Sequence, residues 1–371
     1  MDFDFSDDQQ QLRDAVAKWV EKGYDFERRK KIVAAGGFDR GVFGELAELG
    51  LTGLPIDPDH GGMGMGPVEC MVTMEELGKG IALEPLAQSW ISGVLIERFG
   101  DDALKAAWLP RIASGEALVV LAHQERKARY RLDVCESRAA SAGQGWTVSG
   151  QKNIVPAGDQ ADAWIVPALR GGSLGLYLVE KGAAGVSTRG YVTQDESRAA
   201  DLLLADAPAT LLTSDGQTAL TLGADIGIAC ACAEGVGVME RLLAMTVEYM
   251  NQRKQFGVTI STFQALRHRV ADMKMQLELA RGMSYYATLK LGAPEAERRL
   301  ALSRAKVQLG QSMRFVGQQA VQLHGGIGVT DEYAGSHYFK KLTQLEMTFG
   351  DTMHHLGEVS SRLQDTAGVF A

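Results

Sequence analysis

The sequence is poor in cysteine and has no long hydrophobic run, and both features narrow the classes of protein to which it can belong. Four cysteines occur among 371 residues, and none forms a Cys-x-x-Cys pair. This sparse use predicts reduced thiols in a cytoplasmic protein rather than a disulfide framework. No stretch approaches about 18 consecutive apolar residues, so no membrane span is expected.

Basic residues are outnumbered by acidic ones, with 38 Lys and Arg against 46 Asp and Glu. The formal net charge is -8 at pH 7, which argues against a nucleic-acid partner. The first ten residues, MDFDFSDDQQ, lack the basic and apolar regions of a signal peptide. Charged residues make up 23% of the chain and hydrophobic residues 46%, the composition of a globular protein. A chain of this length fits two or three domains.

The first third of the sequence is patterned as helices. Ser6 and Gln9 form a capping box that begins a predicted helix over residues 7–22. Further helices are predicted over residues 40–49, 66–80, 85–99 and 101–113, with the Gly- and Pro-rich segment LPIDPDHGGMGMG as a loop. We therefore expect an all-helical N-terminal domain over residues 1–115.

The pattern changes in residues 116–210, where Gly, Pro and Asp separate short apolar segments. Five of these are predicted as strands of a central β-sandwich or barrel domain: ALVVLAH, GWTVSGQKNIV, DAWIVPAL, GLYLVE and DLLLAD. Gly171, Gly172 and Ser173 mark a turn between two of them.

Long helical patterns return in residues 211–371. They predict one helix from about residue 215 to 251, two more over 262–291 and 296–323, and a last one over 351–366. The sequence thus predicts an α+β fold whose C-terminal domain is a four-helix bundle. Glycine costs a helix about 1 kcal/mol relative to alanine. The first long helix contains four of them, so we expect close backbone packing at Gly223, Gly227, Gly235 and Gly237.

Two segments of the C-terminal domain carry a family resemblance. Residues 249–273, YMNQRKQFGVTISTFQALRHRVADM, contain Arg-x-x-Phe-Gly followed by Phe-Gln and Ala-Asp-Met. The segment QLHGGIGVTDEY, from Gln322, contains Gln-x-x-Gly-Gly-x-Gly. Together with GLTGLPIDPDHGGMGMG, MEELGKG and the helix–β–helix order, these segments make the whole chain resemble the acyl-CoA dehydrogenase superfamily.

The resemblance implies a cofactor, a substrate and a set of contacts. In this family a carboxylate removes the α-proton of an acyl-CoA thioester while N5 of FAD accepts hydride from the β-carbon, and an electron-transferring flavoprotein reoxidises the flavin. The C-terminal bundle of one protomer holds the ADP half of its neighbour's FAD. The matching residues in this chain are Arg253, Phe256, Gln264, Gln322, Gly325 and Gly326.

The chemistry of these residues suits that role. A guanidinium fork matches a pyrophosphate, and glycines allow close approach of the backbone to a ligand. Each residue also has a simpler interpretation, because an arginine on a helix is usually solvated and a Gly-Gly after a helix is usually a cap.

The central domain departs from the family pattern where the flavin ring would bind. The family's loop Thr-Glu-Pro-Gly-x-Gly-Ser-Asp corresponds to HQERKARYRLD, residues 123–133, in which Glu125 matches the Glu. The family's Trp-x-Thr/Ser segment becomes Ile154 and Pro156, and proline has no backbone N–H. The loop has also lost its glycines and hydroxyl donors and gained four cations: Arg126, Lys127, Arg129 and Arg131.

The catalytic base is missing as well. Phe349 and Gly227 occupy the two places at which family members carry a basic Glu, and a positioned base is worth about 10²–10⁴-fold in rate. The catalytic residue is therefore unassigned. Asp225 matches the Asp of the family's CoA-binding Asp-x-x-Arg segment, whose Arg is here Ile228, so it is a candidate contact for substrate or CoA.

Other polar groups lie near Phe349 in the sequence. Glu346 and Asp351 are its nearest carboxylates, and Asp351 is equally suited to the N-terminus of a helix. His354 and His355 are interpreted as surface histidines, and no metal site is expected.

The leading hypothesis follows from this asymmetry, because the ADP-half residues remain while the ring contacts and the base are lost. Heteromeric α2β2 members of the family divide labour in this way. The chain resembles the small subunit of the pimeloyl-CoA type, which predicts a partner subunit that completes the FAD site of a second polypeptide. Two alternatives remain: a self-sufficient homo-oligomeric dehydrogenase with a relocated base, and a flavin-free acyl-CoA-binding or scaffold protein.

Overall fold

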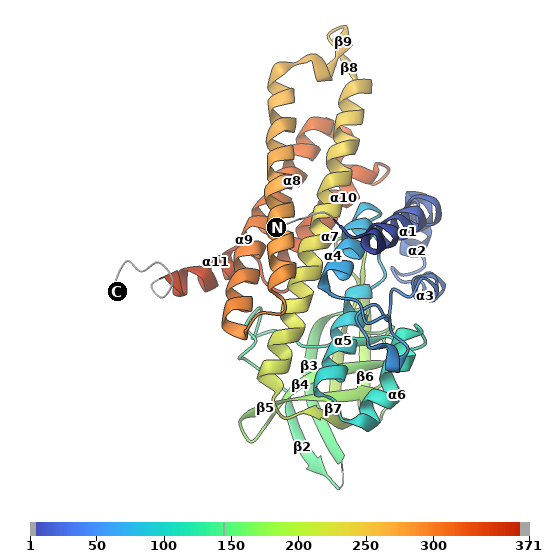
Figure 1. Cartoon of the computed structure of the whole chain (residues 1–371), viewed down its shortest axis with the longest axis vertical. Helices are drawn as coiled ribbons and strands as arrows, with labels where there is room; N and C mark the ends of the chain where they lie inside the picture. Colours follow the sequence, from blue (N-terminus) through green and yellow to red (C-terminus); the bar gives the residue numbers. More distant parts are fainter. Residues whose placement is uncertain (1–4, 144, 364–371) are drawn as a thin grey trace. The chain divides into compact units, whose positions relative to one another are not determined.

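A computed structural model describes residues 5–143 and 145–363 (Figure 1). The chain forms two compact units, each assembled from segments that are distant in sequence. The first comprises Met1–Arg28, Pro67–Ala82 and Ile228–Ala371, and the second comprises Arg29–Gly66 and Leu83–Gly227.

The first unit is helical. Helix α1 (Asp7–Gly23) packs on α4 (Pro67–Lys79), and α9 (Glu295–His324) packs against α8 (Gln264–Lys290), α10 (Ala334–Met347) and α11 (Thr352–Ser361). The predicted helices at these places are confirmed, except that α10 was not predicted and residues 364–366 lie outside the described ranges. The capping box at Ser6 and Gln9 is present with both of its hydrogen bonds.

Helix α7 (Gly216–Gln252) packs closely on α4, and glycines on both helices let the two backbones approach each other. A Cβ atom at Gly237 would lie 1.8 Å from the Glu75 carbonyl oxygen, and one at Gly78 would lie 2.3 Å from that of Glu234. A Cβ at Gly235 would lie 2.7 Å from the Met313 sulfur. These contacts confirm the predicted close packing at Gly235 and Gly237. The helix is long and apolar enough to cross a membrane, but 89% of its most apolar 18-residue window is buried within the protein, the pattern of a core helix.

The second unit is built on a seven-stranded sheet. Strand β4 pairs with β5, β5 with β7, β7 with β3, β3 with β2, and β2 again with β4, so these five strands close a barrel. β1 extends from β4 and β6 from β7. The strands are β1 (Val119–Leu121), β2 (Arg138–Ala142), β3 (Gly145–Pro156), β4 (Ala163–Arg170), β5 (Ser173–Glu180), β6 (Val186–Val192) and β7 (Arg198–Thr213).

The five predicted strand segments and the turn at Gly171 and Gly172 are confirmed, whereas β2 and β6 were not predicted. Four helices precede or accompany the barrel: α2 (Phe26–Ala34), α3 (Arg40–Glu48), α5 (Leu86–Phe99) and α6 (Asp102–Ala113). Of these, only α2 was not predicted. Phe43 of α3 belongs to the barrel's hydrophobic core, and α5 packs on β1. The order of helices, β region and helices confirms the predicted fold, while the domain limits at residues 115 and 210 remain predictions.

Candidate functional site

One turn predicted to contact a nucleotide lies at the end of α7. Arg253 follows that helix directly, and the hairpin of β8 (Lys254–Gln255) and β9 (Val258–Thr259) places Phe256 at its tip. The Phe256 ring is 91% exposed. Gln264, the first residue of α8, is also exposed. Within the described residues, the Arg253 guanidinium makes no hydrogen bond or ion pair, so its fork of donors is open to an anion.

The second turn follows α9. Gly325 has φ 64° and begins the short 3-10 helix η3 (Gly325–Val329). No atom lies within 4 Å of a Cβ built on Gly325 or Gly326, and both are exposed together with Gln322. Bare backbone and a side-chain amide therefore face outward, the arrangement that lets a ligand approach the chain closely.

The two turns are neighbours. Tyr249, one helical turn before Arg253, accepts the Arg253 backbone N–H at 2.8 Å and donates its hydroxyl to the His324 carbonyl oxygen at 3.2 Å. The structure thus brings Arg253 and the Gln322–Gly326 segment together in one unit. Tyr249 was not predicted as part of this site, although it lies four residues before Arg253, the spacing of neighbours on one helix face.

The loop at the family's flavin-ring position is tied to the protein's own core. Lys152, fully buried on β3, donates to Glu125 at 2.6 Å, and Ser137 donates to the same carboxylate through its N–H at 3.1 Å and its hydroxyl at 2.7 Å. Burial alone raises the pKa of Glu125, but the Lys152 charge and these hydrogen bonds outweigh it and lower the pKa to about 2. Glu125 is therefore a structural anion at neutral pH.

The segment around Ile154, which matches the family's Trp-x-Thr/Ser contact with the flavin ring, uses its backbone N–H groups in hydrogen bonds within the same unit. The Ile154 N–H donates to the Tyr191 hydroxyl at 3.1 Å, and the Asn153 N–H donates to the Gln124 carbonyl at 2.8 Å. The Ala157 N–H donates to the Arg198 carbonyl at 2.7 Å. Ile154 itself has φ 52° and lies where the β3–β7 register shifts. With Pro156 in this segment as well, few donors remain for a flavin ring.

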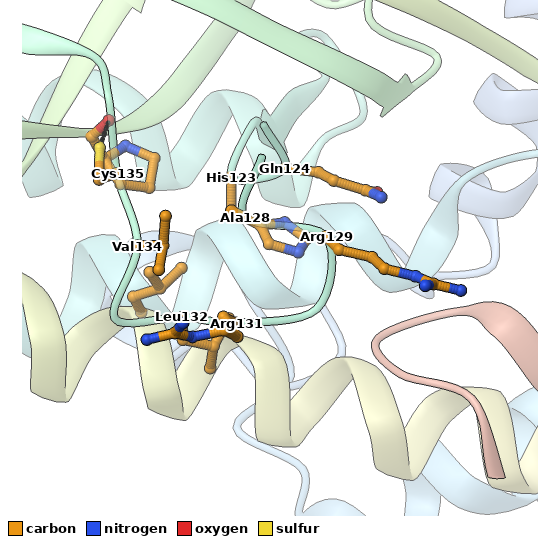
Figure 2. A pocket seen from close by; sticks show the side chains of 10 residues that line it. His123, Gln124, Ala128, Arg129, Arg131, Leu132, Val134 and Cys135 are labelled. Atoms are coloured by element: carbon orange, nitrogen blue, oxygen red, sulfur yellow. Dashed lines mark hydrogen bonds between the residues drawn. The ribbon is translucent and has the colours of Figure 1, made fainter. Parts of the chain in front are cut away.

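Little space remains beneath the loop either. Figure 2 shows a pocket lined in part by His123, Arg129, Leu132 and Cys135. Its volume is about 10 Å³, roughly the room that one water molecule needs. Burial and the Lys152 charge lower the pKa of His123 to about 4, so this imidazole is neutral at physiological pH.

The position of the family's base is a strained turn without an acid. Phe349 has φ 55°, a left-handed conformation that is rare for a bulky side chain. Its carbonyl accepts from His355 Nε2 at 3.1 Å, so Nε2 carries the hydrogen and Nδ1 accepts from Ser303 Oγ at 3.2 Å. His355 is fully buried, which corrects its interpretation as a surface histidine. Burial, Lys306 and His354 lower its pKa to about 3.

Nearby carboxylates are engaged in structural contacts. Asp351 caps α11 by accepting the His354 N–H at 2.8 Å. Glu346 accepts from the Thr352 N–H at 3.0 Å and hydroxyl at 2.6 Å, and from Arg314 at 3.2 Å. Asp225 is fully buried on α7. Gly227, also on α7, has no side chain to act as a base. Among the residues that the structure describes, no group of three or more potential ligands could hold a metal ion.

The buried Lys306 binds the backbone just before the Phe349 turn. It is fully buried and donates to the Leu345 and Glu346 carbonyls at the end of α10. Burial lowers its pKa from 10.5 to about 8, although Cys232 and Glu346 oppose the shift. Between these two pH values the unfolded chain holds more protons than the folded chain, so stability rises with pH there.

The Lys306→Met variant should lack this rise. The difference in free energy of unfolding between the parent and the variant is expected to shift by about 2 kcal/mol in favour of the parent from pH 7 to pH 10. Urea unfolding at both pH values measures it, with exposed Lys18→Met as the control whose difference from the parent stays constant. An equally constant difference for Lys306→Met would show that Lys306 remains charged when buried.

Comparison with known proteins identifies the family. The profile described as "Acyl-CoA dehydrogenase, N-terminal domain" matches residues 6–116, and "Acyl-CoA dehydrogenase, C-terminal domain" matches residues 215–364. The chain belongs to the acyl-CoA dehydrogenase superfamily. It is 29% identical to the short-chain specific acyl-CoA dehydrogenase of Megasphaera elsdenii, over 93% of this chain and 95% of that one.

Solved structures of acyl-CoA dehydrogenases share the fold. A chain of the ChsE4-ChsE5 complex from Mycobacterium tuberculosis matches with a TM-score of 0.91 and 25% identity, covering 99% of this chain and 100% of that one. A chain of the Tcur3481-Tcur3483 steroid ACAD matches with a TM-score of 0.90 and 26% identity, covering 97% and 99%. The superfamily is one of FAD-dependent oxidoreductases that act on CH–CH bonds.

The residues of this chain suit the two halves of FAD unequally. The outward-facing Arg253, Gln322 and Gly325–Gly326 backbone offer donors and space for an ADP moiety. The ring position offers neither, because Glu125 is bonded within the barrel and the Ile154 N–H is taken by Tyr191. The fit therefore holds for the nucleotide end of the cofactor and fails for the isoalloxazine end.

Proposed function

We propose that this chain is the partner subunit of a heteromeric acyl-CoA dehydrogenase, in which Arg253, Phe256 and Gln322 complete the FAD site of a second polypeptide. The observation that carries the proposal is the contrast between an open nucleotide turn and a ring position whose donors are used internally. FAD bound at such a shared site would accept a hydride from the β-carbon of an acyl-CoA.

Three further observations support a shared site. Phe349 and Gly227 leave both family positions of the base without an acid, so proton abstraction falls to the second polypeptide. The Phe256 ring is almost fully exposed, as expected for a residue awaiting a partner surface. Two matching solved structures are named as pairs of chains. We place the enzyme in the cytoplasm, with an electron-transferring flavoprotein as acceptor, and we propose Asp225 as a contact for acyl-CoA.

The visible absorption spectrum tests the proposal. The chain is expressed alone and together with a candidate second acyl-CoA dehydrogenase subunit, and each preparation receives FAD and then an acyl-CoA. We expect a flavin band that bleaches only in the co-expressed pair. A lone chain that is yellow and bleaches would establish the self-sufficient homo-oligomer instead. Affinity for acyl-CoA without flavin in either preparation would establish the flavin-free alternative.

In the assembled pair, Arg253→Ala in this chain should reduce FAD retention, because an open guanidinium that binds pyrophosphate in two places is lost. Charged hydrogen bonds of this kind are worth about 1.5–3 kcal/mol, so the Kd for FAD should rise more than tenfold. Arg304→Ala provides the control, since this exposed arginine lies 18 residues before Gln322 on α9, about 27 Å along the helix. Equal FAD retention in both variants would refute the assignment of Arg253.

A further inference from the structure

The exposed face of the Gly325–Val329 turn is backed by a cluster of three aromatic residues, the buried His324 and the half-buried Tyr249 and Tyr333. His324 is 4% exposed, and its ring centroid lies 4.6 Å from that of Tyr249 and 4.8 Å from that of Tyr333. The three residues come from α7, from the last position of α9, and from the segment before α10. The cluster therefore joins α7, which ends one residue before Arg253, to the turn that carries Gly325 and Gly326.

The hydrogen bonds of His324 define its protonation state. Nδ1 lies 2.8 Å from the Ala320 carbonyl, which only accepts, so Nδ1 carries the hydrogen. Nε2 lies 2.7 Å from the Tyr333 hydroxyl. In the neutral ring Nε2 is an acceptor, so the hydroxyl donates to it. Burial lowers the pKa of His324, which keeps this tautomer neutral at physiological pH.

Each contact fixes a different part of the turn. The Tyr249 hydroxyl holds the His324 carbonyl, which lies directly before Gly325. The Tyr333 hydroxyl holds the imidazole, so the segment that leaves the turn is tied to the residue that enters it. Gly328 closes the inner side, where a Cβ would lie 3.0 Å from the His324 Cβ. The inner face is thus packed while Gly325 and Gly326 stay open to solvent.

We propose that Tyr249, His324 and Tyr333 are positioning residues that set the spacing between the Arg253 guanidinium and the Gly325–Gly326 backbone, and so shape the site for the pyrophosphate and adenosine of FAD. This inference rests on the proposed function, because it assigns the support of the same nucleotide turn. None of the three side chains needs to touch the cofactor. Their effect is exerted through Arg253 and through the conformation of η3.

The test uses the assembled pair of subunits with Tyr333→Phe and Tyr249→Phe in this chain. Each change removes one hydroxyl and keeps the ring. The Kd for FAD is expected to rise about five- to tenfold, the loss that follows when a hydrogen bond supporting a binding site is removed. The Kd for ADP, added as a competitor, should rise by the same factor. The position of the flavin absorption band should not move, since the ring is held elsewhere.

Thr246→Val is the matched control. The Thr246 hydroxyl is fully buried on α7 and donates to the Leu242 carbonyl at 2.7 Å, so the variant also loses one buried hydroxyl with little change in shape. It should lower the Tm to a similar extent and leave the Kd for FAD unchanged. If the tyrosine variants lower the Tm in the same way without weakening FAD or ADP, the positioning role is wrong.

The two proposals fail in different ways. If Arg253→Ala weakens FAD binding and the tyrosine variants do not, the shared site stands and only the positioning role is lost. If Arg253→Ala has no effect on FAD, the nucleotide site itself is misassigned.

Discussion

Replacing Gly237 by alanine is expected to destabilise the protein by about 4 kcal/mol or more, beyond the usual cost of overpacking a core. The added Cβ would lie 1.8 Å from the Glu75 carbonyl oxygen, which belongs to a helix backbone and cannot rotate away. Helices α4 and α7 would have to separate along their crossing. Urea unfolding measures the loss, and failure to accumulate as soluble protein would be its extreme form.

Gly282→Ala provides a control of opposite sign. Gly282 lies within α8, is exposed, and has no atom within 4 Å of a built Cβ. Alanine there should stabilise the helix by about 0.5–1 kcal/mol. If Gly237→Ala were also neutral or stabilising, the two helices would not be packed as closely as described.

Lys152→Met should cost about 3–5 kcal/mol, because it leaves the Glu125 carboxylate buried without its counter-charge. Lys152 is fully buried and Glu125 is 3% exposed. The same lysine also donates to the Pro167 carbonyl at 2.8 Å, so the variant loses a contact to β4 as well. The free energy of unfolding at pH 7 is the measurement.

Two comparisons show whether burial is responsible. Lys127→Met breaks an exposed pair with Glu136 in the same loop and should have no measurable effect. The double variant Lys152→Met with Glu125→Gln removes both charges and should recover part of the loss. A similar cost for the double and the single variant would show that packing, not the uncompensated charge, dominates.

Acid should remove the same contribution in the parent protein. The folded pKa of Glu125 is about 2, below its ordinary value of 4.5. Its stabilisation is therefore fully present above about pH 4.5 and is lost as the pH falls towards 2.

Elements with strong apolar periodicity were predictable from the sequence, and elements defined by their partners were not. Helices α1, α8 and α9 were predicted within a few residues of their observed ends. Strands β2 and β6 were missed because they are mostly exposed and have no alternation of large apolar and polar residues. Their existence depends on hydrogen bonds to β3 and β7. Helix α10 was missed because its start, Ala-Gly-Ser after a glycine-rich loop, carries no side-chain cap.

The candidate site also has a part that was predictable from the sequence and a part that was not. Motifs predicted the residues that are proposed to hold the nucleotide, and the structure places two of them, Arg253 and Gly325, in neighbouring turns. The motifs could not reveal that Tyr191 takes the Ile154 N–H, since the two residues are 37 positions apart. Nor could they reveal the support of His324 by Tyr249, 75 positions away. Such contacts arise from tertiary packing, which sequence spacing does not encode.

The chain by itself exposes apolar side chains to water on the Gly325–Val329 turn and on the hairpin of β8 and β9. The exposed fractions are 91% for Phe256, 44% for Val258, 43% for Ile327 and 70% for Val329. Surfaces of this kind attract chaperones and promote self-association. In the heteromer proposed above, a surplus of this polypeptide over the second subunit is therefore expected to be cleared or to aggregate, and synthesis of the two in matched amounts is expected.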